Sequence, residues 1–241
     1  LYSLLHLTGY KDFPMDEIKN FRQLGAKTAG HPENFLSPAI ETTTGPLGQG
    51  ISNAVGFAMA EEVLRARFGK KLVDHYTYVI AGDGCLMEGV SQEAISLAGR
   101  HALSKLIVFW DNNNITIDGT VDLADRTDQV MRFKASGWQV LEIDGHSPIE
   151  IDEAIKTAKK SKKPTMIACK THIALGSSAQ DTSKGHGALT DATLIADTRK
   201  TYGWLSGPFE IPAHIKTAWE EMGKRCVAER DAWVERLSGI S

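Results

Sequence analysis

Cysteine is scarce in this chain of 241 residues, which contains only Cys85, Cys169 and Cys226. Three widely separated cysteines cannot form a complete disulfide framework, and they lack the close spacing of a zinc site. This usage is typical of a reducing compartment. The sequence therefore predicts a cytoplasmic protein whose stability depends on neither disulfides nor structural zinc.

Long apolar runs and an excess of one charge are also missing. No stretch reaches the roughly 18 unbroken apolar residues of a membrane span, so none is predicted. Lys and Arg number 27 against 30 Asp and Glu, for a net charge of −3. That balance gives no electrostatic reason to expect a nucleic-acid or anionic-membrane partner. The one basic cluster, Lys156 to Lys163, is expected on the solvent face of a helix.

The start of the chain has no initiator Met and no secretion signal. Leu1 to Leu7 is apolar, but it lacks a basic segment before it and a cleavage site after it. We therefore expect the chain to begin inside a longer protein. A hydrophobic content of 42% and a charged content of 24% are ordinary for a globular protein.

Apolar strands alternate with amphipathic helices along most of the sequence. The predicted strands are Thr77 to Ile80, Leu106 to Trp110, Trp138 to Ile143 and Thr165 to Cys169. The predicted helices are Leu1 to Leu7, Asp16 to Leu24, Gly45 to Arg67, Glu88 to Leu103, Thr127 to Ser136, a helix starting at Ser147-Pro148, Thr190 to Tyr202 and His214 to Leu237. This alternation predicts an α/β fold, a parallel sheet with helices on both faces.

Polar residues follow two of these strands at the point where each strand ends. Gly82-Asp83-Gly84 follows the first strand, and Asp111-Asn112-Asn113 follows the second. The 28 residues between Gly84 and Asn113 are enough for one helix and one strand, so the two tips should be neighbours. Open α/β sheets bind ligands at the edge formed by the carboxyl ends of their strands, where both polar segments are expected to lie. A carboxylate and a carboxamide beside bare backbone suit Mg²⁺ with a diphosphate.

A nicotinamide-type glycine loop is the competing interpretation of the first tip. In that fingerprint a third glycine should fall three residues after Gly84, but position 87 is Met87. The spacing therefore does not support a dinucleotide site.

Five short motifs in this order resemble the transketolase family: Gly30-His31-Pro32-Glu33, Thr43-Thr44-Gly45-Pro46-Leu47-Gly48-Gln49-Gly50, Gly82-Asp83-Gly84-Cys85-Leu86, Asp111-Asn112-Asn113 and Ile115-Thr116-Ile117-Asp118-Gly119. The match covers most of residues 1 to 205. It implies the thiamine diphosphate-binding fold, with thiamine diphosphate and Mg²⁺ (or Ca²⁺ or Mn²⁺) as cofactors. It also implies transfer of a two-carbon ketol unit between sugar phosphates in the pentose phosphate pathway.

The resemblance also implies roles for individual residues. The metal ligands would be Asp83, Asn113 and the carbonyl of Ile115. The cofactor would contact Gly45, Pro46, Leu47, Gly82, Asp83, Gly84, Glu88, Asn113, Ile117 and His186. The catalytic residues would be His31, Glu88 and His186.

Each catalytic assignment carries an expected task. His31 would donate to the developing oxyanion of the substrate. Glu88, with Glu93, would belong to a carboxylate network between the two active sites of a homodimer. His186 would contact the diphosphate and the substrate hydroxyls. Ala174 stands where the family more often has glycine, which puts the shape of the loop before His186 in question.

The resemblance predicts the domain organisation as well. Residues 1 to 206 would form an N-terminally truncated diphosphate-binding domain. Residues 207 to 241 would be a linker and a long helix leading to a missing pyrimidine-binding domain, through which the homodimer would form. The chain alone should therefore be inactive.

Two other classes of function stay open at the level of sequence. A deoxyxylulose phosphate synthase or a 2-oxo acid dehydrogenase component would share the Gly-Asp-Gly signature but not the full set of motifs. A stand-alone or cofactor-free binding module is the alternative that is not an enzyme. The presence of both Asp83 and Asn113 argues against a loss of cofactor binding.

Overall fold

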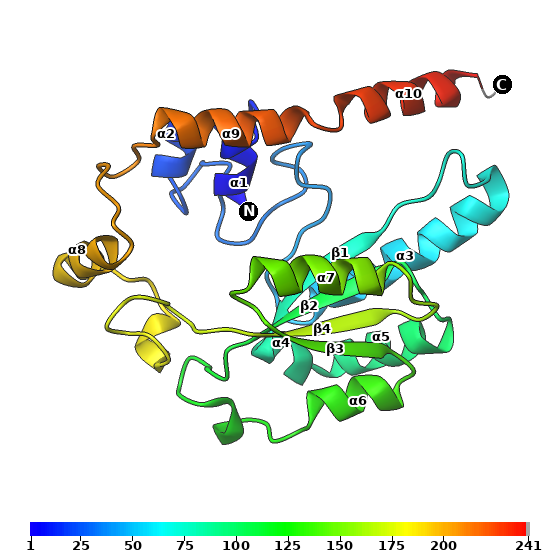
Figure 1. Cartoon of the computed structure of the whole chain (residues 1–241), viewed down its shortest axis with the longest axis horizontal. Coiled ribbons are helices and arrows are strands. Elements are labelled where there is room, and N and C mark those ends of the chain that lie inside the picture. Colours follow the sequence, from blue (N-terminus) through cyan, green and yellow to red (C-terminus); the bar gives the residue numbers. More distant parts are fainter. Residues whose placement is uncertain (240–241) are drawn as a thin grey trace. The chain divides into compact units, whose positions relative to one another are not determined.

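The structure is a computed structural model that describes residues 1–239. It divides into two compact units. The sheet unit comprises Leu47–Arg67 and Val73–Trp204, and the terminal unit comprises Leu1–Pro46, Phe68–Leu72 and the residues from Leu205 onward. Figure 1 colours both by sequence position.

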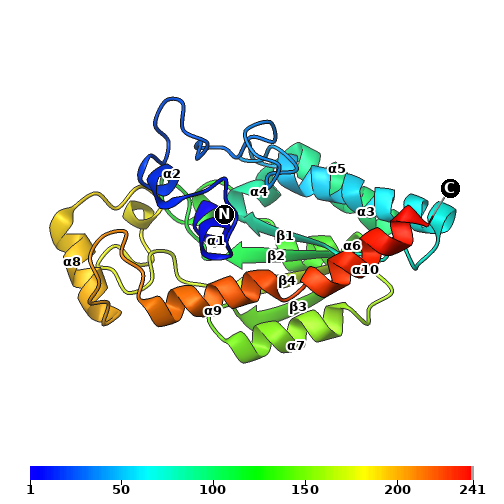
Figure 2. The same cartoon turned by 90° about the horizontal axis from the view of Figure 1, so that it is seen from above.

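The sheet unit contains a parallel sheet of four strands. These are β1 (Thr77–Gly82), β2 (Leu106–Asn112), β3 (Gln139–Asp144) and β4 (Thr165–Lys170), in the order β1-β2-β4-β3. Figure 2 shows the four strands side by side. The predicted parallel sheet is confirmed, and each predicted strand lies within two residues of its observed bounds.

Helices cover both faces of this sheet, as predicted. The helices of the sheet unit are α3 (Gln49–Phe68), α4 (Asp83–Met87), α5 (Gly89–Arg100), α6 (Gln129–Ala135), α7 (Pro148–Ala158) and α8 (Ala192–Thr201), with short 3₁₀ turns at Val121–Leu123 and Ser183–Gly185. Helix α7 lies on one face and α5 and α6 lie on the other (Figure 1). Because side chains alternate along a strand, Val108 and Trp110 join the α5–α6 core whereas Ile107 joins the α7 core.

The start of α7 follows the predicted capping pattern. Ser147 is the N-cap, and its hydroxyl accepts a hydrogen bond of 3.3 Å from the N–H of Glu150. Pro148 occupies the first turn, where its missing N–H costs no hydrogen bond.

The helix predicted from Glu88 to Leu103 is observed as α5, which starts at Gly89. The short helix α4 before it was not predicted, and the extended backbone of Glu88 (φ −70°, ψ 137°) separates the two helices. Side chains from α5 satisfy the carbonyls that α4 leaves free. The Ser91 hydroxyl donates to the Cys85 carbonyl at 2.6 Å, and the Gln92 amide donates to the Leu86 carbonyl.

The terminal unit is helical. It contains α1 (Tyr2–Leu7), α2 (Met15–Lys19), α9 (Ala213–Lys224) and α10 (Val227–Ser238). Its small core consists of Tyr2, Leu5, Phe13 and Ile40. Among residues 1–239, no helix is both long enough and apolar enough to cross a membrane.

The single long helix predicted over 214–237 is wrong, because α9 and α10 are separate. Gly223 weakens the end of α9, since glycine costs about 1 kcal/mol relative to alanine inside a helix. The N–H of Arg225 then bonds to the carbonyl of Met222 at 3.3 Å, which tightens the last turn and ends the helix. The indole N–H of Trp233 on α10 donates to the Leu72 carbonyl at 2.8 Å.

Candidate functional site

The two polar tips lie side by side at the carboxyl edge of the sheet. Strands β1 and β2 pair in parallel, with Gly82 opposite Asp111. Asp83 follows directly as the first residue of α4. The spacing between the two motifs therefore predicted their placement on neighbouring strands correctly.

The carboxylate of Asp83 is buried and only half satisfied. The residue is 8% exposed, and its Oδ1 accepts a hydrogen bond of 2.9 Å from the indole Nε1 of Trp110. Its Oδ2 is buried and accepts no hydrogen bond of regular geometry from any described residue. Burial raises the pKa of Asp83, while the Trp110 hydrogen bond and the backbone N–H of Asn114 oppose the rise. The site thus contains a buried acidic oxygen that accepts no hydrogen bond of regular geometry, and the N–H of Asn114 lies near the same carboxylate.

The loop after β2 holds the second oxygen donor. The Asn113 side-chain oxygen accepts from the Ile115 N–H at 3.0 Å, which leaves it a second lone pair. Asn114 takes a left-handed conformation (φ 64°), and its carbonyl accepts from the Val121 N–H at 3.1 Å. These bonds fix the turn between Asn113 and Ile115.

The Asp111 carboxylate is already hydrogen-bonded to other side chains. One of its oxygens accepts from the Thr171 hydroxyl, and the Asn113 amide nitrogen approaches its other oxygen at 3.4 Å. Asp111 therefore ties the end of β2 to the residue that follows β4, and Asp83 is left as the acid available at this edge.

The oxygen donors at this edge fit a hard cation. In the described part of the chain, no three His, Cys, Asp or Glu side chains form a group that could hold a metal. One carboxylate, one amide oxygen and one backbone carbonyl suit Mg²⁺, which is usually held by few protein groups together with phosphate and water. The partnerless Oδ2 of Asp83 is the kind of atom that a cation would satisfy.

The glycines of this edge differ in what surrounds them. A Cβ added at Gly82 would meet no described atom within 4 Å, whereas one at Gly84 would lie 3.1 Å from Leu47. A Cβ at Gly48 would lie 2.9 Å from the Cβ of Glu88. Leu47 and Gly48, which directly precede α3, therefore pack against Gly84 of α4 and against Glu88, the residue between α4 and α5.

His31, Gly45 and Pro46 belong to the terminal unit. All three are exposed. Gly45 has φ +131°, and a Cβ there would lie 2.4 Å from the imidazole Cδ2 of His31. Glycine is therefore required at this position on both counts, and the structure brings His31 and Gly45 into contact.

The remaining predicted residues lie at the surface of the sheet unit. Glu88, Ile117 and His186 are exposed, and His186 directly follows the 3₁₀ turn Ser183–Gly185. Ile117 is 70% exposed. Neither Glu88 nor His186 makes a side-chain hydrogen bond among the described residues, so both side chains are accessible to a ligand.

The loop before His186 contains a pair that the sequence did not predict. The Nδ1 of His172 lies 2.8 Å from a carboxylate oxygen of Asp181. Its ring stacks on that of His146, with 5.7 Å between the centroids. Ala174 has φ 49°, a conformation that glycine adopts more readily. Glycine would therefore fit the backbone at position 174 with less strain than alanine does.

Two hollows flank the carboxyl edge of the sheet. One of about 210 Å³ is lined by Asp83, Trp110, Asn112, Asn114 and the segment 121–129. The other, of about 520 Å³, is lined on the α7 face by Asp111, His146, Thr171 and His172 among others. The role of Trp110 was missed by the sequence analysis, since in sequence it is one more apolar residue of a buried strand.

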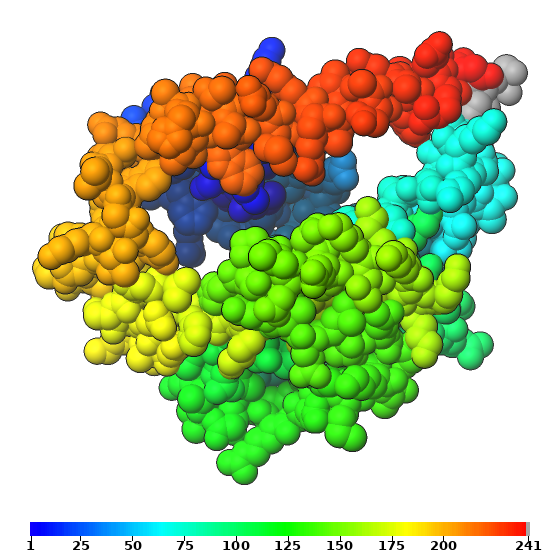
Figure 3. Space-filling model, viewed as in Figure 1, coloured from blue at the N-terminus to red at the C-terminus, as the bar shows by residue number. Residues whose placement is uncertain are grey.

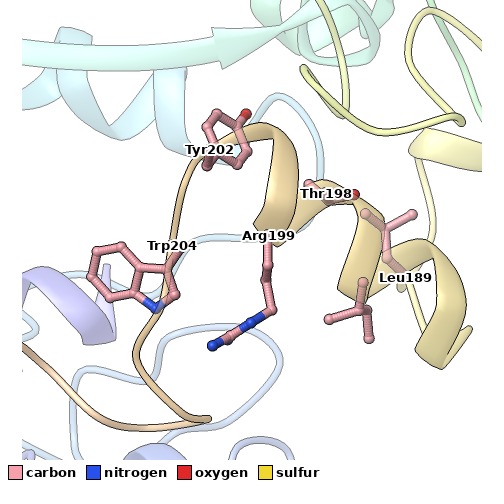
Figure 4. A pocket seen from close by; sticks show the side chains of 6 residues that line it. Leu189, Thr198, Arg199, Tyr202 and Trp204 are labelled. Carbon is pink, nitrogen blue, oxygen red and sulfur yellow. The ribbon is translucent and has the colours of Figure 1, made fainter.

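A third hollow of about 320 Å³ lies against α8. It is lined by Leu189, Ile195, Thr198, Arg199, Tyr202 and Trp204. Arg199 extends between Trp204 and Leu189 in Figure 4. This hollow contains none of the predicted site residues and no carboxylate, so it is not the candidate cation site.

Comparisons with known proteins agree with this geometry. The sequence profile of the family described as "Transketolase, thiamine diphosphate binding domain" matches residues 1–240. The transketolase of Rhodobacter capsulatus is 58% identical over 241 residues, which are 100% of this chain and 36% of that protein. This chain therefore spans about a third of the length of the curated relatives it matches.

Solved structures give the same result. The crystal structure of Campylobacter jejuni transketolase superposes with a TM-score of 0.93 at 43% identity, covering 99% of this chain and 38% of that one. A Pichia stipitis transketolase in complex with sedoheptulose 7-phosphate gives a TM-score of 0.91 at 44% identity, covering 97% of this chain and 36% of that one. The chain belongs to the transketolase family, a family of transferases, and corresponds to its thiamine diphosphate-binding domain.

Proposed function

We propose that the protein containing this chain is a transketolase that needs a divalent cation, most naturally Mg²⁺, to bind thiamine diphosphate. The observation that carries the proposal is the buried Oδ2 of Asp83, which lacks a hydrogen-bond partner beside the Asn113–Ile115 turn. A buried, unpaired carboxylate oxygen is costly, so a cation at this position would relieve a cost that the fold otherwise bears.

Three groups of this chain would hold the cation: the Asp83 carboxylate, the Asn113 amide oxygen and the Ile115 carbonyl. Thiamine diphosphate would supply the nucleophilic carbon and the electron sink for the reaction. Gly82 and Gly84 would admit its diphosphate to the backbone. The open space at Gly82 supports this role, because no described atom needs that space. Gly45, Pro46, Leu47 and Ile117 would line the cofactor.

The catalytic assignments follow the family pattern. His31 would donate a hydrogen bond to the oxygen on which negative charge develops. His186 would contact the diphosphate and the substrate hydroxyls, and Glu88 would join the carboxylate network of a homodimer. The exposure of all three side chains is compatible with contacts to a ligand or a second subunit.

The substrates would be a ketose phosphate donor and an aldose phosphate acceptor, as in the pentose phosphate pathway. The Pichia stipitis relative has been solved with sedoheptulose 7-phosphate, which supports this substrate class. Residues 1–206 would act as the diphosphate-binding domain, and residues 207–241 would lead toward a pyrimidine-binding domain. We propose a cytoplasmic homodimer that has no nucleic-acid or membrane partner and in which this chain alone is inactive.

Product analysis on the complete gene product tests the proposal. With Mg²⁺ and thiamine diphosphate, xylulose 5-phosphate and ribose 5-phosphate should yield sedoheptulose 7-phosphate. Product from pyruvate and glyceraldehyde 3-phosphate alone would reassign the protein to the synthase class. Turnover by residues 1–241 in isolation would contradict the proposed dependence on further domains.

A further inference from the structure

Trp110 and Asp83 form a buried pair that the family assignment does not explain. Trp110 is 8% exposed and lies on β2 opposite Ala81, two residues before Asp83. Its indole Nε1 donates to Asp83 Oδ1 at 2.9 Å, and this hydrogen bond is fully buried. Both residues line the same hollow of about 210 Å³.

A second buried tryptophan, Trp138, shows that a buried indole N–H in this core does not need a carboxylate as its hydrogen-bond acceptor. Trp138 lies in the same core, is 3% exposed and donates to the backbone carbonyl of Ile95 at 2.9 Å. A backbone carbonyl therefore satisfies a buried indole in this core without burying a charge. Trp110 instead bonds a carboxylate, whose burial is unfavourable unless an opposite charge compensates it.

The hydrogen bond also makes the two oxygens of Asp83 different. Oδ1 accepts from Trp110, whereas Oδ2 accepts no hydrogen bond of regular geometry, although the backbone N–H of Asn114 lies near this carboxylate. A carboxylate held in this way can offer a cation one oxygen. Single-oxygen ligation suits the strict octahedron of Mg²⁺, whereas Ca²⁺ readily accepts a carboxylate through both oxygens.

We propose that Trp110 is a positioning residue for the cation: its indole N–H occupies Oδ1 of Asp83, so that Asp83 binds Mg²⁺ through Oδ2 alone. This inference rests on the proposed function, in which Asp83 is a metal ligand. Trp110 touches neither substrate nor cofactor in this account. It acts by fixing the rotamer and the free oxygen of Asp83 before the cation arrives.

The test compares Trp110→Phe with Trp138→Phe in the complete gene product. Both variants remove one buried indole hydrogen bond from the same core, so Trp138→Phe is a matched control for lost packing and stability. Calorimetric titration of Mg²⁺ in the presence of saturating thiamine diphosphate gives the Mg²⁺ Kd of each protein. Trp110→Phe should weaken Mg²⁺ binding by about 10-fold, the lower end of the effect of losing a partner of a metal ligand.

Ca²⁺ titration separates positioning from general damage. Without Trp110, Asp83 can turn to offer both oxygens, so Ca²⁺ affinity should fall less than Mg²⁺ affinity. Trp138→Phe should leave both Kd values within about twofold of wild type, a range of roughly 0.4 kcal/mol. An unchanged Mg²⁺ Kd in Trp110→Phe, or an equal loss in Trp138→Phe, would overturn the inference.

If Trp110→Phe does not fold, ¹⁹F NMR of wild-type protein tests the same inference. In protein labelled with 5-fluorotryptophan, addition of Mg²⁺ should shift the ¹⁹F resonance of Trp110 and not that of Trp138. Signals are assigned by replacing the other tryptophans with Phe, and an unmoved Trp110 signal would refute the proposal. If wild-type protein binds no Mg²⁺ with thiamine diphosphate, the proposed function itself fails, which distinguishes the two outcomes.

Discussion

Gly82 is a glycine that the protein's own packing does not require. Its backbone (φ −86°, ψ 177°) is available to any residue, and a Cβ there would meet no described atom within 4 Å. We predict that Gly82→Ala changes the free energy of unfolding by less than about 0.5 kcal/mol. If the diphosphate approaches this backbone, the same change should weaken thiamine diphosphate binding about 10-fold or more, roughly 1.4 kcal/mol.

Urea unfolding and calorimetry check the two parts of this prediction separately. Gly45→Ala is the contrasting variant, because φ +131° and the imidazole of His31 at 2.4 Å both oppose a Cβ there. It should destabilise the fold clearly. Unchanged cofactor affinity in Gly82→Ala would show that the glycine does not serve the ligand.

Cys169 is a cysteine whose reactivity the fold suppresses. Burial raises the pKa of its thiol to about 11, and the nearby Asp111 charge adds to the rise. Only the thiolate reacts, so at pH 8 about 0.1% of this side chain is reactive, and the reactive fraction increases only as the pH approaches 11. We predict that a disulfide reagent at pH 8 modifies the exposed Cys226 quickly and Cys169 only after unfolding.

Mass spectrometry of tryptic peptides after timed labelling measures both rates. Labelling in urea is the control, because it should make the two rates similar. Equal rates at Cys169 and Cys226 in the folded protein would contradict the buried environment of Cys169.

The loop between β4 and α8 holds two non-glycine residues, Ala174 and Asp181, in left-handed conformations. Ala174 has φ 49°, a left-handed conformation that costs a residue with a Cβ about 1–2 kcal/mol. Ala174→Gly removes this cost and adds roughly 0.5–1 kcal/mol of chain entropy to the unfolded state. We predict a net stabilisation of up to about 1 kcal/mol, measured by thermal or urea unfolding.

Ala179→Gly is the control within the same loop. Ala179 is 3% exposed and does not have a positive φ, so glycine there should destabilise by about 1 kcal/mol. Destabilisation by Ala174→Gly of the same size would mean that the loop does not hold Ala174 in the left-handed region.

Helix α9 is fixed against the end of α1 by a close backbone approach. A Cβ at Gly223 would lie 2.1 Å from the carbonyl oxygen of Thr8, so alanine cannot fit without movement. Propensity alone would favour alanine by about 1 kcal/mol. We predict the opposite sign, a destabilisation of about 1–3 kcal/mol typical of overpacking, measured by unfolding of the complete protein.

Ala218→Gly is the reference variant, because Ala218 is exposed on the same helix and glycine there changes stability through helix propensity alone. It should cost about 1 kcal/mol through propensity. A stabilising Gly223→Ala would show that α1 and α9 do not approach each other this closely.

Sequence patterns predicted the elements of the sheet unit well, for identifiable reasons. Buried parallel strands give continuous apolar runs, and Ser147-Pro148 with Glu150 marks a helix start locally. The short helix α4 and the break at Arg225 were not predicted, since they depend on hydrogen bonds made by Ser91 and Met222 after folding.

The candidate site was predictable only in part. Spacing alone placed Asp83 beside the Asn113 loop, because strand and helix lengths are regular. The hydrogen bond from Trp110 joins residues of different elements, and the pairing of His172 with Asp181 joins residues nine positions apart in one irregular loop. Such partners are set by the packing of the sheet unit, and no local sequence signal marks them.

The thermal stability of the complete protein should depend on bound thiamine diphosphate and Mg²⁺. A cofactor that binds only the folded protein stabilises it by mass action, about 2.7 kcal/mol at a concentration of 100 Kd. We predict that thiamine diphosphate raises the Tm of the complete protein only when Mg²⁺ is present. Chelation with EDTA should remove the increase, and a Tm shift that persists in EDTA would argue against a cation in the site.

The most direct test of the central claim is calorimetric titration of thiamine diphosphate into wild-type and Asp83→Ala protein, each with Mg²⁺ and with EDTA. Removal of the Asp83 carboxylate takes away the partnerless oxygen that we assign to the cation. Wild-type protein should bind thiamine diphosphate only with Mg²⁺, and Asp83→Ala protein should show no Mg²⁺-dependent binding. Normal Mg²⁺-dependent affinity in a folded Asp83→Ala protein would contradict the metal assignment.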